Sequence, residues 1–93
     1  MMKLKAFFGN SIKNEIRELA KSILNDQWKS RVSSVEIEST GILDGQEIVF
    51  EFLEKNESGC AFDHLNYVVS ETETKLTAEQ VVKIKQIDKK LNS

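Results

Sequence analysis

Residues 35–69 read VEIESTGILDGQEIVFEFLEKNESGCAFDHLNYVV, a stretch in which apolar and polar residues alternate between two turn signals. The first signal is Asp44-Gly45, a pair typical of a two-residue β-hairpin turn. The second is Asn56-Glu57-Ser58-Gly59, which we interpret as a four-residue hairpin loop. The two turns imply mutually consistent registers, and a slip of one residue would move every side chain to the opposite face. The stretch therefore predicts three consecutive antiparallel strands over residues 32–43, 46–55 and 60–71.

This register sorts the side chains of the predicted sheet onto two faces. The inner face collects Val35, Ile37, Leu43, Ile48, Phe50, Phe52, Ala61, Leu65, Tyr67 and Val69, which is the composition of a core face. The outer face mixes carboxylates with large apolar groups and includes Glu36, Glu38, Val49, Glu51, Leu53, Phe62, His64 and Val68. An apolar centre with a polar rim is typical of a protein–protein interface. We therefore predict that these eight residues of the outer sheet face bind a partner.

The flanks of the stretch have the periodicity of amphipathic helices. Residues 10–28 place apolar side chains at helical spacing, and residues 77–91 do the same. Thr77 followed by Gln80 indicates a capping box at the start of the second helix. Residues 1–9 are uncertain: residues 2–8 fit the alternation of a strand or an extension of the first helix, and disorder is the third interpretation that stays open.

Two such helices and one apolar sheet face have a simple packing solution. Both helices lie on the same face of the sheet and bury it. The predicted fold class is thus α+β, a two-layer domain in which a three-stranded antiparallel meander carries two helices on one face, in the order α-β-β-β-α. With 93 residues, of which 40% are hydrophobic and 30% charged, we expect residues 1–93 to form a single domain.

The charge of the chain is strongly segregated. The formal net charge is -2, but residues 1–31 hold seven basic and three acidic groups, and residues 75–93 hold five basic and two acidic groups. Residues 32–74 hold ten acidic groups and one basic group. Segregation of this kind bears on partners and association rather than on the fold.

Cysteine content and hydropathy bear on the compartment. Cys60 is the single cysteine, so it has no partner for an internal disulfide, which favours a reducing environment. No stretch approaches the ~18 apolar residues that a membrane span needs. We therefore expect a cytoplasmic protein that does not enter the membrane.

Cys60 and His64 are the residues most suggestive of catalysis, because a cysteine and a histidine together can form a nucleophile and its base. In a strand, four residues span roughly 13 Å, which is too far for a hydrogen bond. We interpret Cys60 as a structural residue and His64 as the cross-strand partner of Glu51. The sequence contains no recognisable metal or cofactor motif, so we expect no catalytic residues, no metal and no cofactor.

Two hypotheses for the function follow. The first is a small non-enzymatic protein–protein interaction module, of the adaptor, inhibitor or immunity type, that binds a protein partner or a second copy of itself through the outer sheet face. The second is a nucleic-acid-binding domain that uses the ridge of Lys13, Arg17 and Lys21 at four-residue steps on the first helix. We favour the first, because the acidic middle of the chain would repel nucleic acid.

The register makes one sharp prediction about two phenylalanines. Phe62 lies on the outer face, so Phe62→Glu is expected to remove the apolar centre of the interface and to spare the core. Phe50 lies on the inner face, so Phe50→Ala is expected to destabilise the fold by about 3 to 5 kcal/mol.

Overall fold

The computed structural model describes residues 2–34 and 41–92, and every regular element in this part of the chain is a helix. The elements are α1 (Met2–Ile23), α2 (Asp26–Ser33), α3 (Gly45–Glu54), α4 (Ser58–Glu71) and α5 (Ala78–Leu91). The predicted α+β fold is therefore wrong, because the segments assigned to the second and third strands form α3 and α4. Half of the first predicted strand, residues 35–40, lies outside the described residues, while its residues 32 and 33 belong to α2 and its residues 41–43 form turns and a bend.

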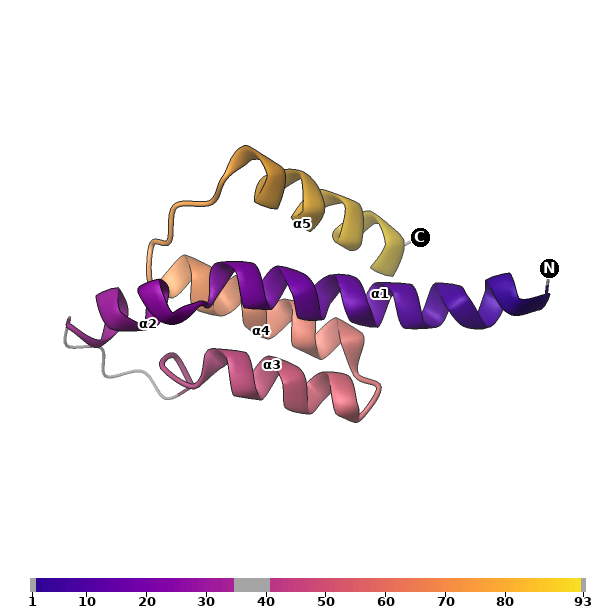
Figure 1. Ribbon diagram of the computed structural model, residues 1–93, viewed down its shortest axis with the longest axis horizontal. Helices are drawn as coiled ribbons and strands as arrows, with labels where there is room; N and C mark the ends of the chain where they lie inside the picture. Colours follow the sequence, from indigo (N-terminus) through magenta and orange to yellow (C-terminus); the bar gives the residue numbers. More distant parts are fainter. Residues whose placement is uncertain (1, 35–40, 93) are drawn as a thin grey trace.

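The helices are arranged around α1. Helices α3 and α4 pack against each other as an antiparallel helical hairpin, and α1 packs against both of them. Helix α5 packs against α1, so that α1 lies between α5 and the α3–α4 hairpin (Figure 1). The N-terminal end of α1 extends beyond the other helices in the same view.

The first predicted helix, residues 10–28, is divided into two helices. Helix α1 includes the ambiguous residues 2–9 and ends at Ile23. Asn25 then has an extended backbone, and its side-chain oxygen accepts a hydrogen bond from the backbone N–H of Trp28 at 2.9 Å. This is the geometry of an N-cap, so Asn25 starts α2 as a separate helix. Trp28 and Val32 of α2 are buried.

Helical spacing explains why α3 and α4 bury the residues that they do. In α3, Gly45, Val49 and Leu53 recur at four-residue steps and are all buried. In α4 the buried residues that follow helical spacing are Ala61, Phe62, Leu65 and Val68. Side chains three and four residues apart lie on one face of a helix, so each helix presents one apolar stripe to the core.

The two turn signals have a different structural role from the one that we predicted. The second lies at the C-terminus of α3, where the N–H of Asn56 donates to the carbonyl of Leu53 at 3.0 Å and that of Glu57 donates to the carbonyl of Phe52 at 2.8 Å. Asn56 has φ 59°. These bonds and the left-handed residue form a Schellman motif, which ends a helix. The first signal supplies Asp44 as the residue before α3.

Helix α5 begins with the capping box indicated by the sequence. The backbone N–H of Gln80 donates to Thr77 Oγ1 at 3.1 Å, and the backbone N–H of Thr77 donates to Gln80 Oε1 at 3.0 Å. Only Ile87 of this helix is fully buried, while Val81 and Val82 are 37% and 51% exposed. Helix α5 thus covers one side of α1 without extending the core far.

The close approach of α3 and α4 leads to a prediction about two glycines. A Cβ on Gly45 would lie 3.0 Å from Val68 Cγ2, and Val68 is fully buried and β-branched, so it has no room to move. We expect Gly45→Ala to destabilise the fold by about 1 kcal/mol or more through overpacking. A Cβ on Gly59 would meet nothing within 4 Å, so Gly59→Ala is expected to stabilise α4 by about 0.5–1 kcal/mol.

Urea unfolding of both variants measures this difference directly. The two substitutions make the same chemical change near the N-terminus of a helix, and each serves as the control for the other. Equal stabilisation by both would show that α3 and α4 do not approach as closely as described.

Candidate protein-binding surface

The structure separates the eight residues that were predicted to bind a partner. Val49, Leu53 and Val68 have 0% exposure, and Phe62 has 3% exposure, so the predicted apolar centre lies in the core. Glu36 and Glu38 lie outside the described residues. Only Glu51 and His64 are accessible, as an exposed and a half-buried side chain respectively.

The helical periodicity explains this outcome. Val49 and Leu53 are four residues apart, and so occupy one face of α3 that packs on the core. In a strand, Val49 and Phe50 would lie on opposite faces of the sheet. The predicted register therefore placed Phe50 in the core and Val49 on the outer face, whereas Val49 is the buried residue of the two. Phe50 is instead half-buried and lies beside α1, with the guanidinium carbon of Arg17 6.0 Å from its ring centroid.

A group of four partly accessible side chains lies on the other flank of the α3–α4 hairpin. Its members are Ile48, Phe52, His64 and Tyr67, here called the aromatic patch. The ring centroids of Phe52 and His64 are 6.4 Å apart, and those of His64 and Tyr67 are 5.8 Å apart. Tyr67 is 42% exposed, whereas the other three are half-buried. The aromatic patch is therefore shared by two helices, and Tyr67 is its most exposed member.

Gly41 organises one end of the aromatic patch. Its carbonyl oxygen lies 3.1 Å from Nε2 of His64, within hydrogen-bond distance. Its φ of 87° is a conformation that glycine adopts without strain. A Cβ at this position would come within 3.3 Å of both His64 Cε1 and Ile48 Cδ1, so glycine also permits the close approach of these two side chains.

The edge of the aromatic patch is shallowly hollowed. A pocket of about 160 Å³ is lined by Ile48, Glu51, Phe52 and Lys55. A volume of this size is too small for most ligands, whose sites measure roughly 300–1,000 Å³. It is suited to a single side chain of a partner. Glu51, one of the two accessible residues of the predicted site, thus borders the aromatic patch.

The α3–α4 hairpin that carries the aromatic patch is acidic. Residues 41–74 contain eight acidic groups and one lysine, a formal net charge of -7. All eight are exposed: Asp44, Glu47, Glu51, Glu54, Glu57, Asp63, Glu71 and Glu73. Among the described residues, two of them form ion pairs, Glu47 with Lys29 at 4.0 Å and Glu51 with Lys55 at 3.9 Å. Such long, exposed pairs contribute little, so the surface stays acidic.

Cys60 and His64 both lie in the helix α4. The strand spacing that argued against a catalytic pair of these two residues is therefore wrong. A spacing of four residues places them on one flank of α4. Within the described part of the chain, however, the hydrogen bond of His64 goes to Gly41, and none joins it to the exposed Cys60. His64 is thus oriented by Gly41 and by its ring neighbours rather than by the thiol.

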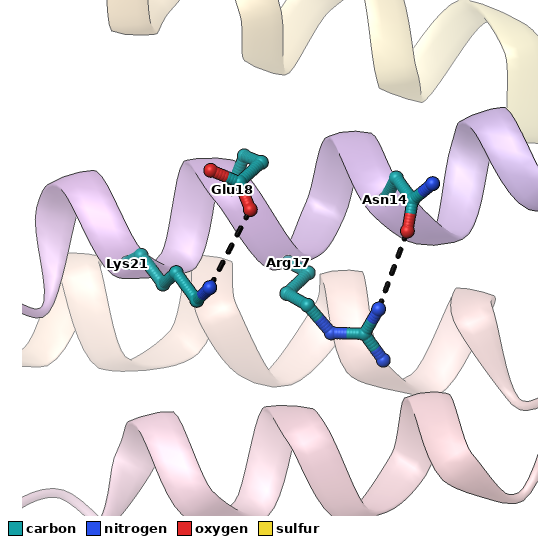
Figure 2. Close-up of polar contacts among 4 residues, drawn as sticks. All are labelled: Asn14, Arg17, Glu18 and Lys21. Atoms are coloured by element: carbon teal, nitrogen blue, oxygen red, sulfur yellow. Dashed lines mark hydrogen bonds and ion pairs between the residues drawn. The ribbon is translucent and has the colours of Figure 1, made fainter.

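The basic ridge of α1 is occupied by contacts within the molecule. Arg17 donates to Asn14 at 3.2 Å, and Lys21 pairs with Glu18 at 3.5 Å (Figure 2). Lys13 donates to Asn56 Oδ1, in the loop between α3 and α4, at 3.4 Å. These exposed contacts contribute as little as the ion pairs of the hairpin do, so what distinguishes the ridge is that it lies beside the acidic hairpin.

A larger groove lies between α1 and α5. It measures about 520 Å³, and its lining includes Leu19, Glu18, Glu79 and Lys83. The charged side chains that line it are of both signs. In the described part of the chain, no buried side-chain polar atom lacks a hydrogen-bond partner, so no buried, unpaired polar group marks this groove as a ligand site.

Sequence reasoning missed Ile48, Phe52 and Tyr67 as surface residues because the predicted register placed all three in the core. The usable signal was the spacing of His64 and Tyr67, three residues apart, which places them on one flank of a helix. No helix in the described ranges is long and apolar enough to span a membrane. Comparisons of the chain with protein-family models, curated proteins and solved structures found no match.

Proposed function

We propose that this chain is a small non-enzymatic protein–protein interaction module, of the adaptor, inhibitor or immunity type, that binds a protein through the aromatic patch. The observation that carries the proposal is the position of Tyr67, which is 42% exposed and whose ring lies tilted beside that of His64, with 5.8 Å between the ring centroids. Tyrosine is enriched among the residues that dominate binding energy at interfaces.

The surroundings of the aromatic patch support the same function. Exposed carboxylates such as Glu51 and Glu71 border a partly apolar centre, which is the core-and-rim pattern of an interface. The rings are ordered by their mutual contacts and by the His64–Gly41 contact. A surface ordered in advance loses less conformational entropy when a partner binds.

Nucleic acid is the less favoured partner. Lys13 bonds to the loop of the acidic hairpin and Arg17 lies 6.0 Å from the ring centroid of Phe50 in α3, so the basic ridge adjoins the acidic segment. A phosphate backbone that approached this ridge would also approach the -7 charge of residues 41–74. We also place the protein in the cytoplasm, because a reducing compartment suits the free and exposed thiol of Cys60.

The test compares two substitutions of exposed apolar residues by the same charged residue. Tyr67→Glu places a carboxylate in the centre of the proposed interface, and Val82→Glu places one on α5, where the valine is 51% exposed. Proteins retained from the native cell by each immobilised chain are compared by quantitative mass spectrometry. The affinity of a protein that depends on Tyr67 is then measured by calorimetry.

We expect Tyr67→Glu to weaken the affinity at least about 30-fold, the loss expected for a dominant interface residue. Val82→Glu is expected to bind as the native chain does. Both variants are expected to keep the native helical circular dichroism, because neither residue is buried. If the native chain and Tyr67→Glu retain the same proteins in equal amounts, the aromatic patch is not the binding site.

A further inference from the structure

The charges near the C-termini of α3 and α4 differ from those of the other helices. Helices α1, α2 and α5 each have a basic residue in the last turn, as with Lys90 in α5, whereas α3 and α4 have none. The last residue of α3 is Glu54, which is followed by Lys55 at the C-cap, and that of α4 is Glu71, which is followed by Thr72. A carboxylate at the negative end of the helix dipole is locally unfavourable.

Lys55 offsets the carboxylate at the end of α3, so Glu71 is the residue whose charge reduces the local stability of its helix. Departures from locally favourable choices are expected mainly at functional sites. Glu71 is four residues from Tyr67 on the same flank of α4, and Glu51 lines the shallow pocket beside Phe52. Two exposed carboxylates, Glu51 and the locally unfavourable Glu71, thus lie near the aromatic patch.

The sign of the charge excludes some occupants of this surface. An isologous dimer through the aromatic patch would bring the -7 charge of residues 41–74 against an identical surface. Juxtaposed like charges suppress an association. A nucleic acid would meet the same repulsion. A different protein with a basic surface is the complementary partner.

We infer that the partner is a basic protein whose lysine and arginine side chains pair with the carboxylates around the aromatic patch while an apolar side chain contacts Tyr67. The inference rests on the proposed function and adds the chemistry of the partner. Complementary charge of this kind chiefly accelerates association and selects the partner. Binding is therefore expected to be sensitive to salt.

The probe is a library of short random peptides displayed on phage and selected on the immobilised native chain at low salt. We expect the selected peptides to combine lysine or arginine with a tryptophan, leucine or phenylalanine. Selection is expected to fail on Tyr67→Glu and to succeed on Val82→Glu. The strongest peptide is then synthesised, and its affinity is expected to fall at least ~10-fold in 1 M salt, where the Debye length is about 3 Å.

Two double variants distinguish the effect of carboxylates beside the aromatic patch from the effect of the total charge of the protein. Glu51→Gln with Glu71→Gln removes two carboxylates beside the aromatic patch. Glu18→Gln with Glu79→Gln removes two exposed carboxylates from the groove between α1 and α5. The first pair is expected to weaken the synthetic peptide about 5- to 10-fold, since each removed rim charge contributes on the order of 0.5 kcal/mol or more. The second pair is expected to change the affinity less than 2-fold.

The outcomes distinguish the two proposals. Peptides that require Tyr67 but carry no net positive charge would overturn the basic partner and leave the binding surface in place. Basic peptides that bind Tyr67→Glu as well as the native chain would show non-specific attraction, and so would overturn the inference. If no selected peptide requires Tyr67, the proposed function itself fails. Self-association at high concentration in sedimentation, abolished by Tyr67→Glu, would assign the surface to a second copy instead.

Discussion

Phe62→Glu is expected to unfold the protein. Phe62 is 3% exposed in α4 and belongs to the core cluster with Leu65 and Val68. Removing a buried phenylalanine costs about 3–5 kcal/mol, and an unpaired buried carboxylate adds a penalty of several kcal/mol. A domain of this size is stable by only about 5–14 kcal/mol. Circular dichroism at 25 °C is expected to show loss of the helical signal, with no cooperative thermal transition.

Phe50 supplies the control for this substitution. Phe50 is half-buried at the edge of the core, so Phe50→Ala is expected to cost less than Phe62→Ala in urea unfolding. This order is the reverse of the one that the sheet register predicts. A Phe62→Glu variant that melts like the native protein, together with a severely destabilised Phe50→Ala variant, would refute the helical packing described here.

Trp28→Ala is expected to destabilise the fold by about 3–5 kcal/mol, because the indole is 5% exposed and leaves a large cavity. The ring also bonds to distant residues. Its Nε1–H donates to Thr74 Oγ1 at 3.0 Å, and Thr72 Oγ1 lies 3.4 Å away. These contacts hold α2 against the end of α4. Urea unfolding followed by circular dichroism measures the change, since the single tryptophan is lost from the variant.

A second substitution at the same position separates packing from hydrogen bonding. Trp28→Phe keeps most of the apolar contact but removes the N–H donor. The two threonine hydroxyls still bond to each other at 2.6 Å, and Thr72 still donates to the carbonyl of Val68 at 2.8 Å. We therefore expect Trp28→Phe to cost only about 1 kcal/mol. A loss below about 1 kcal/mol for Trp28→Ala would show that α2 does not pack on this site.

The segment of residues 45–71 shows why the fold class was mispredicted. Within it, Val49 and Leu53 fit the four-residue step of a helix, while Phe50 and Phe52 fit the alternation of a strand. An apolar run of four to eight residues between turn signals does not distinguish a buried helix from a strand by periodicity. The aromatic and β-branched residues of this segment favoured the prediction of strands. The packing of α3 on α4 and α1 decided the outcome.

The turn signals were equally ambiguous. Asn56 tolerates a left-handed backbone, which both a hairpin loop and a helix C-terminus require. At the end of α4, Glu73 has φ 48°. Its N–H donates to the carbonyl of Ser70, and the N–H of Thr74 donates to the carbonyl of Val69, which together form a second Schellman motif. Glutamate rarely adopts a left-handed backbone conformation, so the sequence does not indicate one at this position. No local rule marked that helix end.

Because the predicted fold was wrong, the predicted apolar centre of the binding site was wrong as well. Glu51 and His64 were singled out from the sequence and lie on or beside the aromatic patch, but their neighbours there, Phe52 and Tyr67, were assigned to the core. A change of period from two to 3.6 redistributes every side chain between the faces. Charge composition, in contrast, does not depend on the period, and the acidic character of the hairpin was evident without a structure.

The sequence by itself determined the features that depend on neighbouring residues: the capping box of α5, the amphipathic stripe of α1 and the segregation of charge along the chain. These need only contacts within one or two helical turns. Tertiary structure alone decided that residues 45–54 and 58–71 are helices, that Phe62 is buried and that Tyr67 is exposed. The physical reason is that a short apolar segment can form backbone hydrogen bonds and bury its side chains almost equally well as a strand or as a helix. The neighbouring elements against which it packs therefore decide which of the two it forms.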